Sequence, residues 1–146
     1  MKLHLLDLGS IEYDEGWPLA AAGVSTLSAP APPPARRRVA IIGAVIEHPT
    51  IGPVLFDTGA AAGFEELWPP IVQELFAITE YENEHRLDVA LQAAGYGLED
   101  IRAIVMSHLH LDHAGGLEFF RGTDVPVYVH ADELRNGFYA VATGED

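Results

Sequence analysis

Short apolar runs, separated by turn-forming segments, divide the chain into predicted strands and helices. The strongest strand prediction covers residues 39–48, and after a tight turn residues 54–57 pair back with it as a hairpin. A weaker alternation of apolar and polar residues predicts a first strand over 2–9. Two more apolar runs, 101–106 and 125–130, predict strands in the second half of the chain.

Helical spacing of apolar residues appears between these runs. Residues 83–94 form an amphipathic pattern that ends at Gly95, so one helix is predicted there, with His85 on its solvated polar face. A further helix is predicted to begin at 131–135, whose acidic residues suit a first turn. His130, just before it, belongs to a junction between strand and helix and is not assigned to a site.

Prolines and glycines limit the remaining segments. A helical pattern in the middle of the chain is interrupted by Pro69-Pro70, which predicts a short turn at 64–68 and a helix at 71–76. Residues 20–35 are rich in Ala, Gly, Ser and Pro and are predicted to form a loop. Residues 114–120, which include a pair of glycines, are predicted to begin a short helix.

Composition narrows the class of protein. The 146 residues suit one domain, and a hydrophobic content of 49% is typical of a globular chain. Eight basic against twenty-two acidic residues give a net charge of −14, which argues against nucleic acid or an anionic membrane surface as a partner. No apolar run approaches membrane-spanning length, and charges come too early for a signal peptide, so a cytoplasmic location is expected. Cysteine is absent, so any metal ligands are His and carboxylate groups.

A basic cluster, Arg36-Arg37-Arg38, stands out in this acidic chain. Its simplest role is to form salt bridges with acidic residues of the same chain, because most such clusters are internally paired or solvated. Binding of an anion is the alternative.

The most informative segment is 107–116, Ser-His-Leu-His-Leu-Asp-His-Ala-Gly-Gly. Three histidines and an aspartate follow a predicted buried strand at a spacing that suits metal ligands and makes a poor core. In an extended turn His108 and His110 point the same way and hold one ion. Asp112 and His113 then turn toward a second ion nearby. Four solvated or internally paired side chains are the alternative, which this spacing fits poorly.

This segment resembles the His-x-His-x-Asp-His signature of the metallo-β-lactamase superfamily. Within that superfamily, residues 82–87, 95–96 and 98–101 make the chain most similar to the N-acyl-homoserine lactonases, the quorum-quenching enzymes. The resemblance covers most of residues 39–135. It implies an α+β fold, the αββα sandwich in which two sheets pack face to face between helices.

The same resemblance implies a hydrolytic mechanism. Two divalent transition-metal ions, zinc or else iron, cobalt or manganese, share a bridging hydroxide that attacks the lactone carbonyl, and the ring opens to an N-acyl-homoserine. Asp112 holds one ion and delivers a proton to the leaving alkoxide, so it is the expected catalytic residue. Asp57 lies in an Asp-Thr-Gly segment at a strand end and is expected to orient the ligand loop by hydrogen bonding. Capping of a loop is the alternative role for Asp57.

By resemblance, four apolar side chains belong to the substrate pocket. They are Trp17, Leu75, Phe76 and Leu111. From their sequence context alone, the first three are packing residues. The expected substrate is a small-molecule lactone. A homodimer is the oligomer considered, because the Pro-rich loop of residues 29–35 can reach a neighbouring copy.

The resemblance also implies ligands beyond the histidine segment. A dinuclear site takes a third His for the first ion, a bridging carboxylate and another His for the second, so four of about seven ligands are identified. Residues 1–146 are therefore expected to be the N-terminal part of a single metallo-β-lactamase-like domain. Roughly one sheet of the sandwich would be present, with an exposed face.

Two other functions stay open at this point. A glyoxalase II-type thioesterase, or another hydrolase of the superfamily, carries the same metal segment. In a different class, the chain is a non-catalytic half-domain that binds a metal ion weakly or serves in an interaction. Metal content, and the choice between lactone and thioester substrates, separate these alternatives.

Overall fold

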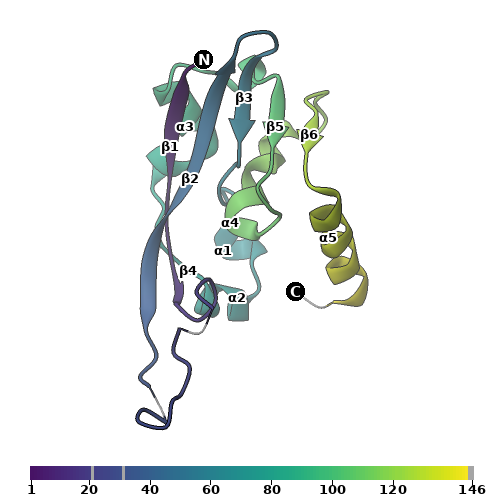
Figure 1. Ribbon diagram of the computed structural model, residues 1–146. Coiled ribbons are helices and arrows are strands. Elements are labelled where there is room, and N and C mark those ends of the chain that lie inside the picture. The colour runs from purple at the N-terminus through teal and green to yellow at the C-terminus, as the bar shows by residue number, and fades with distance from the viewer. Residues whose placement is uncertain (21, 31, 145–146) are drawn as a thin grey trace.

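The computed structural model describes residues 1–20, 22–30 and 32–144. Within these residues, six strands form one mixed sheet in the order β4-β1-β2-β3-β5-β6 (Figure 1). The strands are β1 (Leu3–Asp14), β2 (Arg36–His48), β3 (Gly52–Phe56), β4 (Ala77–Glu80), β5 (Ala103–Val105) and β6 (Val127–Tyr128). The helices are α1 (Phe64–Leu67), α2 (Pro70–Leu75), α3 (Leu87–Ala93), α4 (Leu111–Ala114) and α5 (Ala131–Thr143), with 3-10 turns η1 (Asn83–His85), η2 (Leu98–Asp100) and η3 (Gly115–Phe120).

The direction of the strands decides where the site forms. β1, β2 and β3 are antiparallel neighbours, and the predicted hairpin of β2 and β3 is confirmed. β5 runs parallel to β3, with Phe56 opposite Val105, so the carboxyl ends of these two strands meet at one end of the sheet. Asp57 follows β3 and the histidine segment follows β5. The topology therefore brings both segments to the same place.

One face of the sheet is covered by helices. Leu8, Leu55 and Ile104 project from three strands into the core and are fully buried. Leu91 of α3 and Phe120 of η3 pack against the same cluster. This packing makes the sheet a rigid support for the segments at its end.

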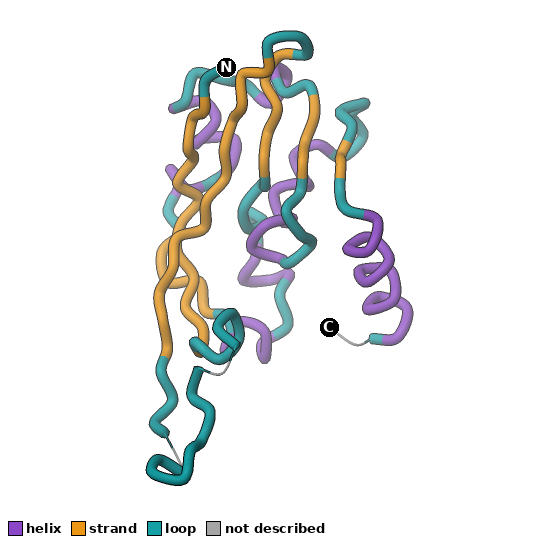
Figure 2. The backbone as a smooth tube through the Cα atoms, in the orientation of Figure 1, coloured by secondary structure: helices purple, strands orange, loops and turns teal. Residues whose placement is uncertain are grey.

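The opposite face of the sheet is open. Leu5 is 70% exposed, and Ile42 of β2 and Phe56 of β3 are exposed on the same side, as the strand register requires. Helix α5 lies beyond β6, apart from the helices over the core (Figure 2). The prediction of an exposed sheet face is therefore confirmed.

The first strand is longer than predicted. It continues from Gly9 to Asp14, because residues 10–14 pair with the first five residues of β2. The register of the pairing with β2 shifts between Asp7 and Ser10. Gly9 lies in this irregular stretch with φ of +104°, a conformation that a residue without a side chain adopts easily.

The predicted helix over 83–94 is interrupted. Its first three residues form the turn η1, Arg86 is extended, and α3 begins at Leu87. The prediction that His85 is solvated is wrong. Its side chain is buried, because Nδ1 accepts a hydrogen bond from the backbone N–H of Glu82 at 2.8 Å and folds the ring over the turn.

The proline break in the middle of the chain is confirmed, with α1 before it and Pro70 as the first residue of α2. Strand β4 was not predicted, because it is a short edge strand that pairs only with residues 10–12 of β1. Of the strand predicted over 125–130, only Val127 and Tyr128 pair with β5. The loop predicted over 20–35 has neither helix nor strand where it is described, and its residues 21 and 31 lie outside the described residues.

The basic cluster forms the expected internal ion pairs. Arg36 Nε lies 2.7 Å from Glu12 Oε1, Arg37 pairs with Glu15, and Arg38 pairs with Glu80 of β4. These pairs join β2 to β1, to the residue that follows β1 and, across β1, to β4. Among the described residues, no helix is both long enough and apolar enough to span a membrane.

Candidate metal centre

Two segments, 57–59 and 107–116, meet at the end of the sheet. The backbone N–H and the hydroxyl of Thr58 both donate to the carbonyl oxygen of His113, at 2.8 Å and 2.7 Å. The N–H of Gly116 donates to the carbonyl oxygen of Gly59 at 3.2 Å. These bonds hold the Asp-Thr-Gly segment directly against the histidine segment.

Close packing of the two backbones requires the glycine pair. A Cβ atom on Gly115 would lie 2.1 Å from the backbone N of Ala61, and one on Gly116 would lie 2.2 Å from the carbonyl oxygen of Thr58. Neither separation is possible for a side chain, and backbone atoms do not yield easily. The glycines therefore set how near the ligand segment lies to the strand ends.

The histidine segment changes conformation in its middle. Helix α4 begins at Leu111, not at Ala114 as predicted, and the stretch predicted as a helix over 114–120 is the 3-10 turn η3. His110 is the extended residue before α4, so the first two histidines precede the helix while Asp112 and His113 lie in its only turn.

The three imidazole rings are gathered. The ring centroids of His108 and His110 are 4.5 Å apart, as expected for alternate residues of an extended segment. The helical turn brings the ring of His113 to 4.0 Å from that of His108. The structure thus brings together the residues that the sequence assigned to metal binding.

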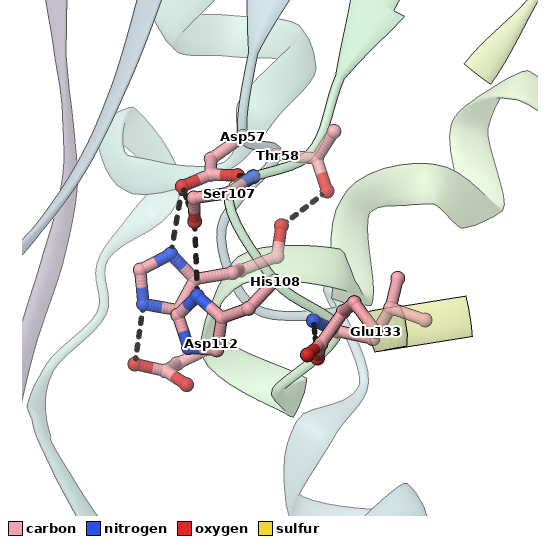
Figure 3. A network of polar contacts seen from close by, with 8 residues as sticks. Asp57, Thr58, Ser107, His108, Asp112 and Glu133 are labelled. Atoms are coloured by element: carbon pink, nitrogen blue, oxygen red, sulfur yellow. Dashed lines mark hydrogen bonds and ion pairs between the residues drawn. The ribbon is translucent and has the colours of Figure 1, made fainter. Parts of the chain in front are cut away.

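Asp57 contacts the ring of His113 and is only 2% exposed (Figure 3). Its Oδ1 accepts the backbone N–H of Ser107 at 2.7 Å, and its Oδ2 accepts the Ser107 hydroxyl at 2.6 Å and Nδ1 of His113 at 2.9 Å. Its φ of +54° is unusual for a residue other than glycine, and these bonds hold it there. The contacts are of the kind expected for a residue that orients ligands.

Two carboxylates hold His113 from both sides. Nδ1 bonds to Asp57, and Nε2 lies 3.4 Å from Oδ2 of Asp112. Burial lowers the pKa of His113, but Asp112 and Asp57 together outweigh it and raise the pKa to about 9. Without a metal ion, this ring is therefore an imidazolium at neutral pH.

The positive charge of His113 lowers the pKa values of the three ionisable groups around it, Asp57, Asp112 and His108. Burial raises the pKa of Asp57, but the hydrogen bonds from His113 and Ser107 lower it more, so the net shift is downward. Burial also raises the pKa of Asp112, and the bond with His113 reverses that. Burial and the charge on His113 lower the pKa of His108. The site therefore combines two carboxylates with a neutral His108.

This donor set fits a divalent transition-metal ion. Imidazole nitrogen and carboxylate oxygen are the ligands such ions take when thiolate is absent. Two ligands of one tetrahedral zinc ion, each about 2.1 Å from it, are about 3.4 Å apart. Asp112 Oδ2 and His113 Nε2 have that separation. In the part of the chain that is described, no hydrogen bond engages Nε2 of His108 or either ring nitrogen of His110.

Only pairs of donor atoms in the described residues are spaced as ligands of one metal ion. Across residues 1–20, 22–30 and 32–144, no group of three or more His, Asp or Glu side chains is arranged to hold an ion as the side chains stand. Asp112 and His113 are instead paired with each other.

The four expected pocket residues separate into two groups. Leu111 lines a cavity of about 480 Å³ beside α4, together with Leu67, Trp68 and Leu117. Trp17 and Phe76 form a different cluster, with ring centroids 5.1 Å apart, and neither they nor Leu75 line this cavity. Trp68 had no signal in the sequence that linked it to Leu111.

Two polar contacts of the histidine segment were also missed. Glu133, in the first turn of α5, accepts the backbone N–H of Leu109 at 2.8 Å (Figure 3). The Ser107 hydroxyl reaches both Asp57 and His108. The position of Ser107 next to the first histidine was a signal for the second contact, whereas no sequence pattern links Glu133 to Leu109.

Known lactonases are similar to this chain in sequence. The N-acyl homoserine lactonase AiiB of Agrobacterium fabrum is 35% identical over 149 aligned residues, which cover 99% of this chain and 52% of the relative. An N-acyl homoserine lactonase of Bacillus cereus is 38% identical over 91 residues, covering 60% of this chain and 36% of that protein. The chain thus spans about half the length of the curated relatives that match it throughout.

Solved structures give the same picture for the fold. An N-acyl homoserine lactone hydrolase with N-hexanoyl-L-homoserine bound at its catalytic metal center matches with a TM-score of 0.70 and 28% identity, over 94% of this chain and 51% of that one. A variant of AiiA from Bacillus thuringiensis with N-decanoyl-L-homoserine at its active site matches with a TM-score of 0.73 and 26% identity, with the same coverage.

The family model with the description metallo-beta-lactamase superfamily matches residues 44–145. That range contains both the Asp-Thr-Gly segment and the whole histidine segment. The α+β fold predicted from the resemblance is confirmed by the neighbours. The chain belongs to the metallo-beta-lactamase superfamily, a superfamily of metallo-hydrolases.

Proposed function

We propose that this chain is the part of an N-acyl-homoserine lactone hydrolase that binds the metal ions, within a single metallo-β-lactamase-like domain. One observation carries the proposal: the rings of His108, His110 and His113 lie together at the end of the sheet, and His113 is paired with Asp112 and with the buried Asp57. The names of the lactonase relatives support the choice of substrate.

Two divalent ions, for which zinc is the first choice, would be held by His108, His110, Asp112 and His113. Further ligands would come from outside the segment. Such ions, when bound, lower the pKa of water and polarise a carbonyl group. The role of Asp57 is to keep the ligand segment in place through Ser107 and His113.

Asp112 is the proposed catalytic residue. In hydrolysis of a lactone, water adds to the ring carbonyl carbon and loses a proton, the bond to the ring oxygen breaks, and that oxygen takes up a proton. A carboxylate beside the reacting atoms can accept the first proton and deliver the second. The lowered pKa of Asp112 keeps its carboxyl group ionised at neutral pH.

The cavity beside Leu111 is the proposed place of the acyl chain. Its lining is largely apolar and adjoins the metal segment through Leu111 and Ala114, which suits a hydrocarbon chain next to a polar reacting group. Glu118 and Arg121 give it a polar part. The cluster of Trp17 and Phe76 is proposed as a second surface that the acyl chain of the substrate contacts.

The experiment is a comparison of two substrates with a metal count. Purified protein is incubated with zinc, and hydrolysis of N-hexanoyl-homoserine lactone and of a glutathione thioester is followed side by side. We use both the 146-residue chain and the longest natural protein that contains it. The proposal expects lactone hydrolysis, and Asp112→Asn should lower it by about 100-fold or more. Asp132→Asn, an exposed aspartate on α5, is the matched control.

Other outcomes point to the alternatives. Faster hydrolysis of the thioester would mean a glyoxalase II-type enzyme. Zinc uptake with neither activity would mean a non-catalytic metal-binding chain. Size-exclusion chromatography of the same sample tests the expected homodimer. A lactonase in the cytoplasm would act on a diffusible signal, which is the quorum-quenching role that we propose.

A further inference from the structure

Ser107 lies between the buried carboxylate and the first histidine. Its hydroxyl oxygen is 2.6 Å from Oδ2 of Asp57 and 2.9 Å from Nδ1 of His108 (Figure 3). Its own backbone N–H donates to Oδ1 of Asp57 at 2.7 Å. Both atoms of Ser107 that can donate a proton are therefore directed at one carboxylate.

The direction of each hydrogen bond follows from counting protons. A carboxylate only accepts, and a hydroxyl has one proton to give. Two oxygen atoms 2.6 Å apart need a proton between them, so the hydroxyl of Ser107 donates to Asp57. Toward His108 that hydroxyl can only accept. The ring must then donate from Nδ1, and because a neutral imidazole carries one proton, its Nε2 is bare.

The same carboxylate fixes the other ring. Nδ1 of His113 donates to Oδ2 of Asp57 at 2.9 Å, which leaves Nε2 of His113 on the side of Asp112. Asp57 is buried and accepts three hydrogen bonds, so it is not free to turn. It therefore orients one histidine directly and a second through Ser107.

We propose that Ser107 is a positioning residue that holds the proton of His108 on Nδ1 and thereby presents Nε2 of His108 to the metal ion. The proposal rests on the proposed metal site for its purpose, but the position of the proton is a property of the chain alone. Metal-ligating histidines are commonly oriented by a partner on the other ring nitrogen, and here that partner is a serine backed by a carboxylate.

The test is the assignment of the ring protons by long-range proton–nitrogen NMR correlation of the metal-free 146-residue chain at mildly alkaline pH. In the wild type, His108 should show a protonated Nδ1 and a bare Nε2. In Ser107→Ala the assignment should move toward a protonated Nε2, because water replaces the hydroxyl and does not select one nitrogen. Ser107→Thr keeps the hydroxyl at an exposed position and should restore the wild-type pattern.

The matched control is Ser10→Ala. Ser10 is a serine of β1 whose hydroxyl also donates to a carboxylate, that of Glu80 at 3.1 Å, and it is not part of the site. Its spectrum should match the wild type at His108. A wild-type ring protonated on Nε2, or a Ser107→Ala ring identical to the wild type, would overturn the proposal. The wild-type spectrum decides the direction of the bond even if a variant does not fold.

Zinc affinity gives the second readout. Competition with a chelating dye should show Ser107→Ala weakened by roughly tenfold, the lower end of what removal of such a partner costs, with Ser107→Thr near the wild type. Equal affinity of wild type and Ser107→Ala would count against the proposal. A chain that takes up no zinc would contradict the proposed function, and the NMR assignment would still decide the role of Ser107.

Discussion

Two carboxylates at opposite ends of the β2–β3 hairpin bind the same kinds of group in different surroundings. Asp57 accepts a hydroxyl from Ser107 and a ring nitrogen of His113. Glu47 accepts the hydroxyl of Tyr96 at 2.8 Å and contacts Nε2 of His4 at 3.2 Å. The side chain of Asp57 is 4% exposed, whereas that of Glu47 is 37% exposed. The two carboxylates therefore have similar hydrogen-bond partners but differ in how far they are buried.

The difference shows why only one of these networks can serve a metal site. Around Glu47, water competes for every hydrogen bond, so each group can exchange partners at little cost. Around Asp57, the backbone is held at a positive φ and both carboxylate oxygens are engaged. Because water does not compete for the hydrogen bonds of the buried Asp57, these bonds hold the histidine rings in fixed orientations. Metal ligands require such fixed orientations.

The largest expected difference is in the free energy of unfolding when Asp57 or Glu47 is replaced. Asp57→Ala should lower the free energy of unfolding by roughly 3 kcal/mol, because it removes one of the two carboxylates paired with His113 and leaves the buried N–H of Ser107 without its acceptor. Glu47→Ala should leave the urea midpoint near the wild type, since solvent replaces its partners. Urea unfolding of both variants measures the contrast, and Asp57→Asn, which keeps the shape and tolerates the positive φ, should be milder. Equal losses at the two positions would contradict the comparison.

A smaller loss is expected when the backbone of the histidine segment is forced away from residues 60–61, which follow the Asp-Thr-Gly segment. Gly115→Ala places a Cβ against the backbone N of Ala61 and should cost about 1–3 kcal/mol. Gly63→Ala is the matched control, because the nearest atom to its Cβ is a side-chain oxygen of Glu66 at 3.5 Å. Thermal unfolding followed by circular dichroism should separate the two variants. A Gly63→Ala variant as unstable as Gly115→Ala would show that the effect is not close packing.

Loss of the contact from α5 should have a still smaller effect, confined to the histidine segment. Glu133→Ala removes the acceptor for the N–H of Leu109 and should cost about 1 kcal/mol. Amide hydrogen exchange at Leu109 should quicken. Glu133→Gln keeps an acceptor oxygen and should retain the protection. Unchanged exchange in Glu133→Ala would mean that α5 does not support the segment.

The smallest effect is the response of the exposed network to acid. Hydrogen bonds from Tyr96 and then His4 hold the pKa of Glu47 below its ordinary 4.5. Because the folded pKa is the lower one, the stability that Glu47 contributes is present above pH 4.5 and is lost as the pH falls through the folded value. The difference in urea midpoint between wild type and Glu47→Gln should therefore shrink in acid. A difference that grows on acidification would contradict this sign.

Much of the site was predictable because it is local in sequence. His108, His110, Asp112 and His113 lie within six residues, so an extended stretch followed by one helical turn is enough to gather them. The orienting role of Asp57 was predictable from the resemblance of its Asp-Thr-Gly segment to the superfamily, whereas its position at a strand end also allowed a loop cap. The parallel pairing of β3 and β5 then explains why two segments fifty residues apart meet.

The rest depends on contacts that no local pattern encodes. Glu133 reaches Leu109 only because β6 pairs in parallel with β5, so that α5, which follows β6, begins beside the histidine segment. His85 was misplaced because a single hydrogen bond to the N–H of Glu82 turned a polar side chain inward. The early start of α4 was missed because the apolar spacing of Leu109 and Leu111 suited an extended segment as well as a helix.

The central claim is that the histidine segment over Asp57 binds a divalent metal ion, and the most direct test is zinc content after dialysis. The 146-residue wild-type chain, the double variant His108→Ala with His110→Ala, and Asp57→Asn are loaded with zinc, dialysed and analysed by mass spectrometry of the metal. We expect the wild type to retain about one zinc ion or more per chain, the double variant to retain almost none, and Asp57→Asn to lie between them. A wild-type chain that retains no more zinc than the double variant would contradict the account.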